Sequence, residues 1–228
     1  MAGPPVLLVN RATTDWGVTP DALARALQRF IDEHLYSVWG TACTVDVAPE
    51  LRPGCWGVVF LDHADQAQAL GYHDLTPDGL PLGKVFIQTT LADGQKVSVT
   101  AAHELAEMLL DPALNEKVPA SDGTIYAFEI CDPVEGSEFA IDGVPLASFV
   151  YPAWFQEYWA PGSVRFDHLG ALTRPFELLP HGYMPIFKNG AWSRVFGSLS
   201  TESLHKDRDP RGRRRERRGR PLHRSTGK

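Results

Sequence analysis

One imidazole and two carboxylates are spaced along a single segment so that they can act on one metal ion. The segment 97–112 reads VSVTAAHELAEMLLDP, whose composition favours a helix that Pro112 terminates. His103 and Glu107, four residues apart, then lie one turn apart on the same side, with about 6 Å between their Cβ atoms. A histidine nitrogen and a carboxylate oxygen at this spacing can bind the same metal ion at roughly 2.0 to 2.2 Å each. Glu104, rotated by about 100° around the helix from His103, would lie beside that ion, where a general base is needed.

A metal site of this kind needs a third protein ligand, and acidic residues follow the helix. In the segment 126–135, YAFEICDPVE, the residues at 126, 128 and 130 alternate as the core face of a strand. That alternation puts Glu129 on the opposite face of the strand and Asp132 just past its end. We favour Glu129 as the third ligand, and Asp132 as the alternate ligand or as the group that orients His103. A plain ion pair between His103 and Glu107 and a solvated acidic turn are the alternatives.

Other polar residues near this motif are assigned lesser roles. Asp111 is eight residues after His103, about 12 Å along the helix axis, so it cannot reach the same ion. A carboxylate at a helix C-terminus is unfavourable to the helix dipole, so we expect Asp111 to have a partner. Asp111 would then either cap the backbone or hydrogen-bond to a metal ligand. The histidines His63, His73 and His168 are possible ligands without a supporting spacing, and we interpret them as surface or core histidines.

The motif HELAE resembles the HExxH helix of the zinc metallopeptidases called zincins, with Glu107 in place of the second histidine. Together with the DP that follows and with EICDP, it resembles a group of HExxE zincin-like proteins, some of them encoded by phages. The resemblance implies one Zn²⁺ held by His103, Glu107 and either Glu129 or Asp132. It also implies that Glu104 acts as general base while metal-activated water hydrolyses a peptide bond of a peptide or protein substrate. An anionic Glu107 makes the metal a milder Lewis acid, so a slow peptidase, a highly selective one or an inactive relative is expected.

The elements around the motif predict an α+β fold in a domain spanning residues 1–200, and the resemblance implies that this fold has a zincin-like mixed β-sheet and an active-site helix. In zincins the edge strand of the sheet binds an extended substrate beside the metal, and we expect the segment 84–88 to be that strand. An aromatic-rich segment, 148–159, predicts core or a subunit interface, with a substrate-lining wall as the alternative. The other predicted elements are a strand at 6–10, a helix from Pro20 to about Tyr36 capped by Thr19, strands at 43–47 and 56–61, a Pro/Gly-rich connection at 71–81 and a hairpin at 138–146.

Charge divides the chain into an acidic body and a basic end. The net charge is −6 over 228 residues, but residues 205–228 hold 11 Lys or Arg and 3 Asp or Glu, a local charge of +8. We expect residues 201–228 to be a disordered basic tail, because the tail has almost no apolar side chains to bury. The arginines of this tail are candidates for binding nucleic acid or another polyanion, with a merely solvated tail as the alternative. They are Arg213, Arg214, Arg215, Arg217 and Arg218.

The sequence also bounds location and leaves a second class of function open. No apolar run approaches the roughly 20 residues of a membrane span, and the first residues lack a basic leader, so we expect a cytoplasmic protein with no membrane partner. The alternative to a peptidase is a phage or prophage virion or assembly protein. In that protein the metal site is a structural brace, and the partners are nucleic acid, virion components or further copies of the chain.

Overall fold

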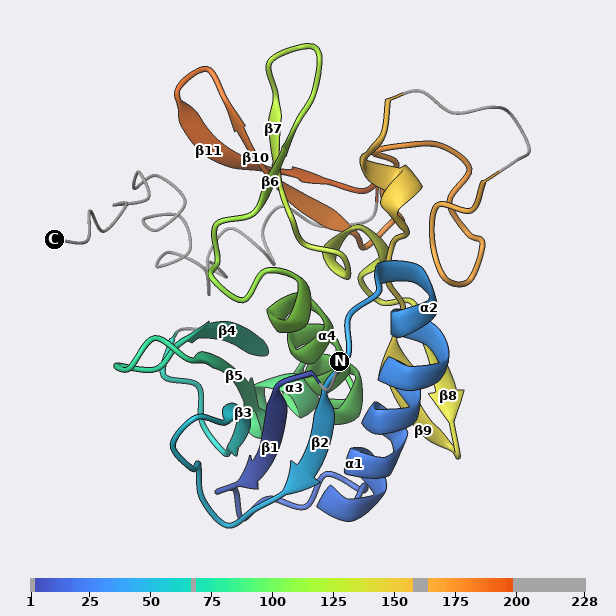
Figure 1. Cartoon of the computed structure of the whole chain (residues 1–228). Helices are drawn as coiled ribbons and strands as arrows, with labels where there is room; N and C mark the ends of the chain where they lie inside the picture. The colour runs from blue at the N-terminus through green and yellow to red at the C-terminus, as the bar shows by residue number, and fades with distance from the viewer. Residues whose placement is uncertain (1–2, 67–68, 158–163, 199–228) are drawn as a thin grey trace, which may run out of the picture.

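A mixed five-stranded sheet forms the lower part of the molecule in Figure 1. The computed structural model describes residues 3–66, 69–157 and 164–198, and it is an α+β fold. The strand order of this sheet is β2-β1-β3-β5-β4, in which all neighbouring pairs are parallel except the antiparallel pair β4 and β5. Its strands are β1 (Pro5–Asn10), β2 (Thr44–Val47), β3 (Trp56–Leu61), β4 (Gly71–Leu75) and β5 (Pro81–Phe86).

The first helical segment confirms the predicted start and runs slightly past the predicted end. Helix α1 (Pro20–Arg29) begins after Thr19, whose Oγ1 accepts a hydrogen bond from the backbone N–H of Ala22. The helix continues through a π-helical segment, Phe30–Leu35, into α2 (Tyr36–Trp39). Its apolar face packs with the inner face of the sheet in the main hydrophobic core.

The edge of the sheet differs from the prediction. The segment predicted as the edge strand, 84–88, contributes its first residues to β5, which lies inside the sheet between β3 and β4, and its last residues to helix α3 (Ile87–Ala92). The strand at this edge of the sheet is β4, which lies in the segment predicted as a connection. That prediction was wrong because β4 carries a glycine, a histidine and an aspartate, residues typical of loops, although Gly71–Asp74 are buried.

Helix α4 (Val97–Leu110) is the predicted motif helix, and it packs on β4 and β5. It lies at the centre of the molecule in Figure 1. Every residue from Ala101 to Leu109 is buried, so both sides of the helix are covered by other elements. The polar residues of the motif are therefore held inside the protein.

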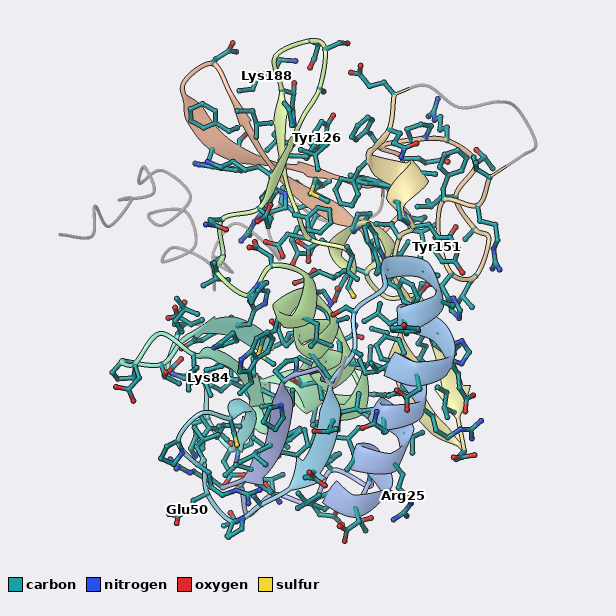
Figure 2. All side chains as sticks on the ribbon, in the orientation of Figure 1. Arg25, Glu50, Lys84, Tyr126, Tyr151 and Lys188 are labelled. Atoms are coloured by element: carbon teal, nitrogen blue, oxygen red, sulfur yellow. The ribbon has the colours of Figure 1, made fainter. Side chains whose placement is uncertain are left out.

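A second sheet and a hairpin complete the fold. The second sheet, of order β11-β10-β7-β6, occupies the upper part of Figure 1, and side chains fill the region between it and α4 in Figure 2. The predicted hairpin at 138–146 is confirmed as β8 and β9. The remaining elements are β6 (Lys117–Pro119), β7 (Ile125–Ala127), a 3-10 helix (Asp132–Val134), β8 (Glu138–Ile141), β9 (Val144–Ala147), a 3-10 helix (Pro152–Phe155), β10 (Tyr183–Lys188) and β11 (Ala191–Phe196).

Two segments bear on further predictions. The aromatic-rich segment contributes to the core, since Phe149 and Trp154 are fully buried and Trp154 Nε1 donates a hydrogen bond to the carbonyl of Glu177. The predicted basic tail, 201–228, lies outside the described residues. None of the helices in the described part of the chain is long and apolar enough to cross a membrane.

A pair of histidines should make the stability of this fold depend on pH. The ring of His168 stacks on the ring of Phe149, with 4.8 Å between the ring centroids, and its centroid lies 4.9 Å from that of the His34 ring. Burial, together with the charges of His34 and Arg165, lowers the pKa of His168 to about 4, and Asp167 opposes this only in part. Burial also lowers the pKa of His34, against the effect of Glu33.

Both histidines therefore bind protons more weakly in the folded chain than in the unfolded chain, where the pKa is about 6.5. We expect the free energy of unfolding to fall as the pH is lowered from about 6.5 to about 4. The part due to His168 should be about 1 to 2 kcal/mol, allowing for the half-exposed ring. Urea denaturation of the wild type and of His168→Gln across this range measures it as the difference between the two curves. Parallel curves would contradict the assignment.

Candidate metal centre

The first group of metal-binding side chains joins helix α4 to the 3-10 helix Asp132–Val134. Nε2 of His103 lies 3.2 Å from Oε1 of Glu107 and 3.2 Å from Oδ1 of Asp132. One ligand atom from each of these residues lies within 4.8 Å of the other two. All three residues are buried, which excludes the alternatives of a solvated surface ion pair and a solvated acidic turn. Imidazole and carboxylate donors in this arrangement can hold a metal ion.

A further carboxylate orients His103. Nδ1 of His103 lies 3.2 Å from Oε2 of Glu135, whose side chain is partly exposed. An imidazole that donates its Nδ1–H to a carboxylate presents Nε2 as the metal-binding atom. Asp132 is the first residue of the 3-10 helix, and Glu135 directly follows that helix. The period of three residues places both on one side. Glu135 therefore provides the orienting contact that the sequence assigned to Asp132 as an alternative.

A second group lies on the other side of Glu107. Nδ1 of His73, on the edge strand β4, is 3.2 Å from Oε2 of Glu104 and 3.9 Å from Oε2 of Glu107. These three residues also offer ligand atoms within 4.8 Å of one another, and all three are buried. His73 was predicted to be a surface or core histidine without a role, and the structure instead places it against two residues of the motif.

The helix itself explains why Glu107 belongs to both groups. At about 100° per residue, Glu104 lies about 100° around the axis from His103, and Glu107 lies about 40° around it, one turn further on. Glu107 is therefore between the other two in projection. Its Oε1 faces His103 and its Oε2 faces His73.

The helix can lie this close to the sheet because two glycines face it. A Cβ at Gly71 would lie 2.8 Å from Cγ2 of Thr100, 2.9 Å from the carbonyl oxygen of Lys84 and 3.1 Å from Cγ of Glu104. At Gly83 the nearest atoms would be at ordinary contact distances, 3.5 Å or more. Gly71, two residues before His73, is thus the position at which a side chain would separate β4 from the helix.

Replacing Gly71 by alanine should therefore loosen the site as well as the fold. We expect Gly71→Ala to lower the free energy of unfolding by about 1 to 3 kcal/mol, because the carbonyl of Lys84 cannot yield without moving the strand. Gly83→Ala is the matched control in the neighbouring strand, and it should have a much smaller effect. Chemical denaturation of both variants measures the difference, and equal losses would show that the close approach at Gly71 is unimportant.

The electrostatics of the first group favour a bound cation. Burial alone would lower the pKa of His103, but Glu107, Cys131 and Asp132 together outweigh burial, and the net pKa lies well above the ordinary value. Burial raises the pKa of Glu107, and the carboxylates of Asp132 and Glu129 add to this rise against the effect of His103. The carboxylates thus draw protons into the site, and a metal ion can supply the same positive charge in their place.

The remaining predicted residues lie near this site in different roles. Strand β7 ends at Ala127, so the predicted continuation of the strand to residue 130 is wrong, and Glu129 lies in the turn that follows. Glu129 is fully buried and close enough to raise the pKa of Glu107, but the ligand group at His103 contains Asp132 instead. Oδ1 of Asp111 accepts hydrogen bonds from the backbone N–H groups of Asn115 and Glu116, so this carboxylate holds the backbone of the segment that follows α4. The five tail arginines lie outside the described residues.

Sequence reasoning missed His73 and Glu135. For Glu135 a signal was present, the spacing of three from Asp132 in a segment that begins with Asp-Pro. For His73 there was none, because its contact with the motif is made across 31 residues by the antiparallel pairing of β4 with β5.

No protein-family model matches the chain, and neither a curated protein nor a solved structure shows significant similarity to it.

Proposed function

We propose that the protein is a zinc-dependent hydrolase of the metallopeptidase type, with the zinc ion bound by His103, Glu107 and Asp132. The observation that carries the proposal is the convergence of Nε2 of His103 with one oxygen each of Glu107 and Asp132, at 3.2 Å, inside the protein. Two bonds of about 2.1 Å that meet at about 100° separate their ligand atoms by about 3.2 Å. The donor set therefore fits a zinc ion without a change of fold.

The arrangement of the sheet and helix supports the same proposal. A mixed sheet with one antiparallel edge strand, followed by a buried helix that carries HExxE, agrees with the zincin-like order expected from the sequence. The antiparallel edge strand is β4, which passes next to α4 and carries His73. In this proposal β4 takes the place beside the metal at which zincins bind an extended peptide.

Each residue of the motif has a separate task in the proposed reaction. Bound zinc would polarise the substrate carbonyl and make a water molecule more acidic. Glu104, buried one residue after His103, accepts the proton from that water and returns it to the leaving amine. Glu135 holds His103 in the tautomer that presents Nε2, and Asp132 and Glu107 neutralise the ion. Two carboxylate ligands weaken the polarisation, so we expect slow or selective hydrolysis.

Metal analysis combined with a cleavage assay tests this function. The purified full-length chain should contain zinc, and it should cleave an unfolded protein substrate in a reaction that a chelator stops and added Zn²⁺ restores. Zinc binding without hydrolysis of any peptide would instead favour the structural brace of a virion or assembly protein. A chain that binds no divalent metal would contradict both.

A further inference from the structure

We infer that the site holds a second divalent cation, bound by Nδ1 of His73 and Oε2 of Glu104 and shared with the first ion through Glu107. The inference deepens the proposed function, because it adds an ion next to the same reaction centre. It rests on the proposed zinc site only through the shared carboxylate of Glu107.

The distances around the second position are close to those around the first, with one of them longer. Nδ1 of His73 lies 3.2 Å from Oε2 of Glu104 and 3.9 Å from Oε2 of Glu107. In the first group, the two separations from Nε2 of His103 are both 3.2 Å. Ligand atoms on one ion of this class are about 3 to 3.5 Å apart, so a small movement of Glu107 completes the second group.

Glu107 is placed to bridge the two ions. Its Oε1 lies on the side of His103 and its Oε2 on the side of His73. Each ion then receives one imidazole nitrogen, one carboxylate of its own and one oxygen of Glu107. Ions in two-metal hydrolytic sites are about 3.5 to 4 Å apart, and a carboxylate with one oxygen on each ion spans such a separation.

Charge and burial favour two ions over one. Glu104 is 3% exposed, Glu107, Asp132 and Glu129 are fully buried, and they belong to one group of neighbouring side chains. A single divalent ion leaves this group with a net negative charge away from water, which is costly. A second divalent ion removes that excess, and the imidazole of His73, from a different element, supplies the nitrogen donor.

The second ion would make the centre a two-metal hydrolytic site. Oε2 of Glu104 binds the ion, and Oε1 carries the role of base in the proposed reaction. Two ions in such a site can stabilise the attacking and the leaving atoms at the same time. This would compensate for the milder Lewis acidity that the carboxylate ligands impose on the first ion.

The competing interpretation is that His73 is a charged or hydrogen-bonded partner that positions Glu104, with one metal ion in total. Native mass spectrometry and isothermal titration of the chelator-treated full chain with Zn²⁺ separate the two. We expect two zinc ions per wild-type chain and one in His73→Ala. His63→Ala, which removes an exposed histidine that belongs to neither metal-binding group, is the matched control and should still bind two.

Glu104→Gln keeps the volume of the side chain and guards against a folding defect of His73→Ala. In either variant the affinity for the second zinc should fall by at least about 100-fold, while the first remains. One zinc ion in the wild type and also in His73→Ala would overturn the second site and leave the proposed function standing. An absence of zinc from the wild type would overturn the proposed function itself. A single zinc lost in His73→Ala but kept in His103→Ala would overturn both ligand assignments.

Discussion

Replacing His103 by alanine is expected to remove the zinc ion from the first position and to reduce hydrolysis to the background rate. Nε2 of His103 is the only nitrogen donor in the first group, and the two carboxylates that remain would have to hold the ion together. If the binding free energy of a structural zinc ion, about 10 to 16 kcal/mol, is shared among four ligands, losing one weakens binding by more than about 100-fold. Equilibrium dialysis against Zn²⁺ and the cleavage assay measure the two effects. A His103→Ala chain with unchanged zinc content would show that the first position is wrongly assigned.

Glu104→Gln is the informative partner of this variant. It should retain the ion at the first position, since His103, Glu107 and Asp132 are intact. Its turnover should nevertheless fall by about 100- to 10,000-fold, because the general base is removed. His63→Ala should change neither quantity, which controls for nonspecific effects of removing a histidine. Thermal denaturation of each metal-free variant shows whether the fold is retained.

The motif helix could be predicted from the sequence because its determinants are local. Helix propensity, the stop at Pro112 and the spacing of His103 and Glu107 act within a few turns, and α4 runs from Val97 to Leu110 as expected. The cap at Thr19 is local in the same way, and so is the turn at Asp142-Gly143, whose two residues have positive φ. In each of these features, the backbone conformation is determined by residues that are close together in the sequence.

The rest of the site depends on contacts that no local pattern encodes. Strand β4 carries few of the residues that favour a strand, and it forms because its backbone pairs with β5 while α4 covers it. Its buried His73 contacts Glu104 and Glu107 of the motif helix, so the loop-like composition of the segment concealed a strand that belongs to the site. Composition misleads at such positions because a binding site needs polar residues where a strand would otherwise be apolar.

The acidic segment after β7 was ambiguous for a related reason. Alternation of apolar residues predicted a strand that would direct Glu129 toward the metal, but the backbone turns after Ala127, and the N–H of Glu129 donates to the carbonyl of Ala127. The turn leads into the 3-10 helix that carries Asp132, and this helix brings Oδ1 of Asp132 to 3.2 Å from Nε2 of His103. Because of this one turn in the backbone, Asp132 and not Glu129 becomes the favoured third ligand.

Asp132→Asn is therefore expected to weaken zinc binding more than Glu129→Gln. The two substitutions remove the same charge and preserve the shape of fully buried side chains, so the general electrostatic loss is matched. Of these two residues it is Asp132 that belongs to the ligand group at His103, with Oδ1 3.2 Å from Nε2, and we expect its loss to lower zinc affinity by more than about 100-fold. Glu129 acts on Glu107 through its charge. Its loss should lower zinc affinity by about tenfold, as is typical of residues that contact a metal ligand. Competition with a chromophoric chelator measures both affinities, and the reverse order would make Glu129 the ligand and Asp132 the supporting residue.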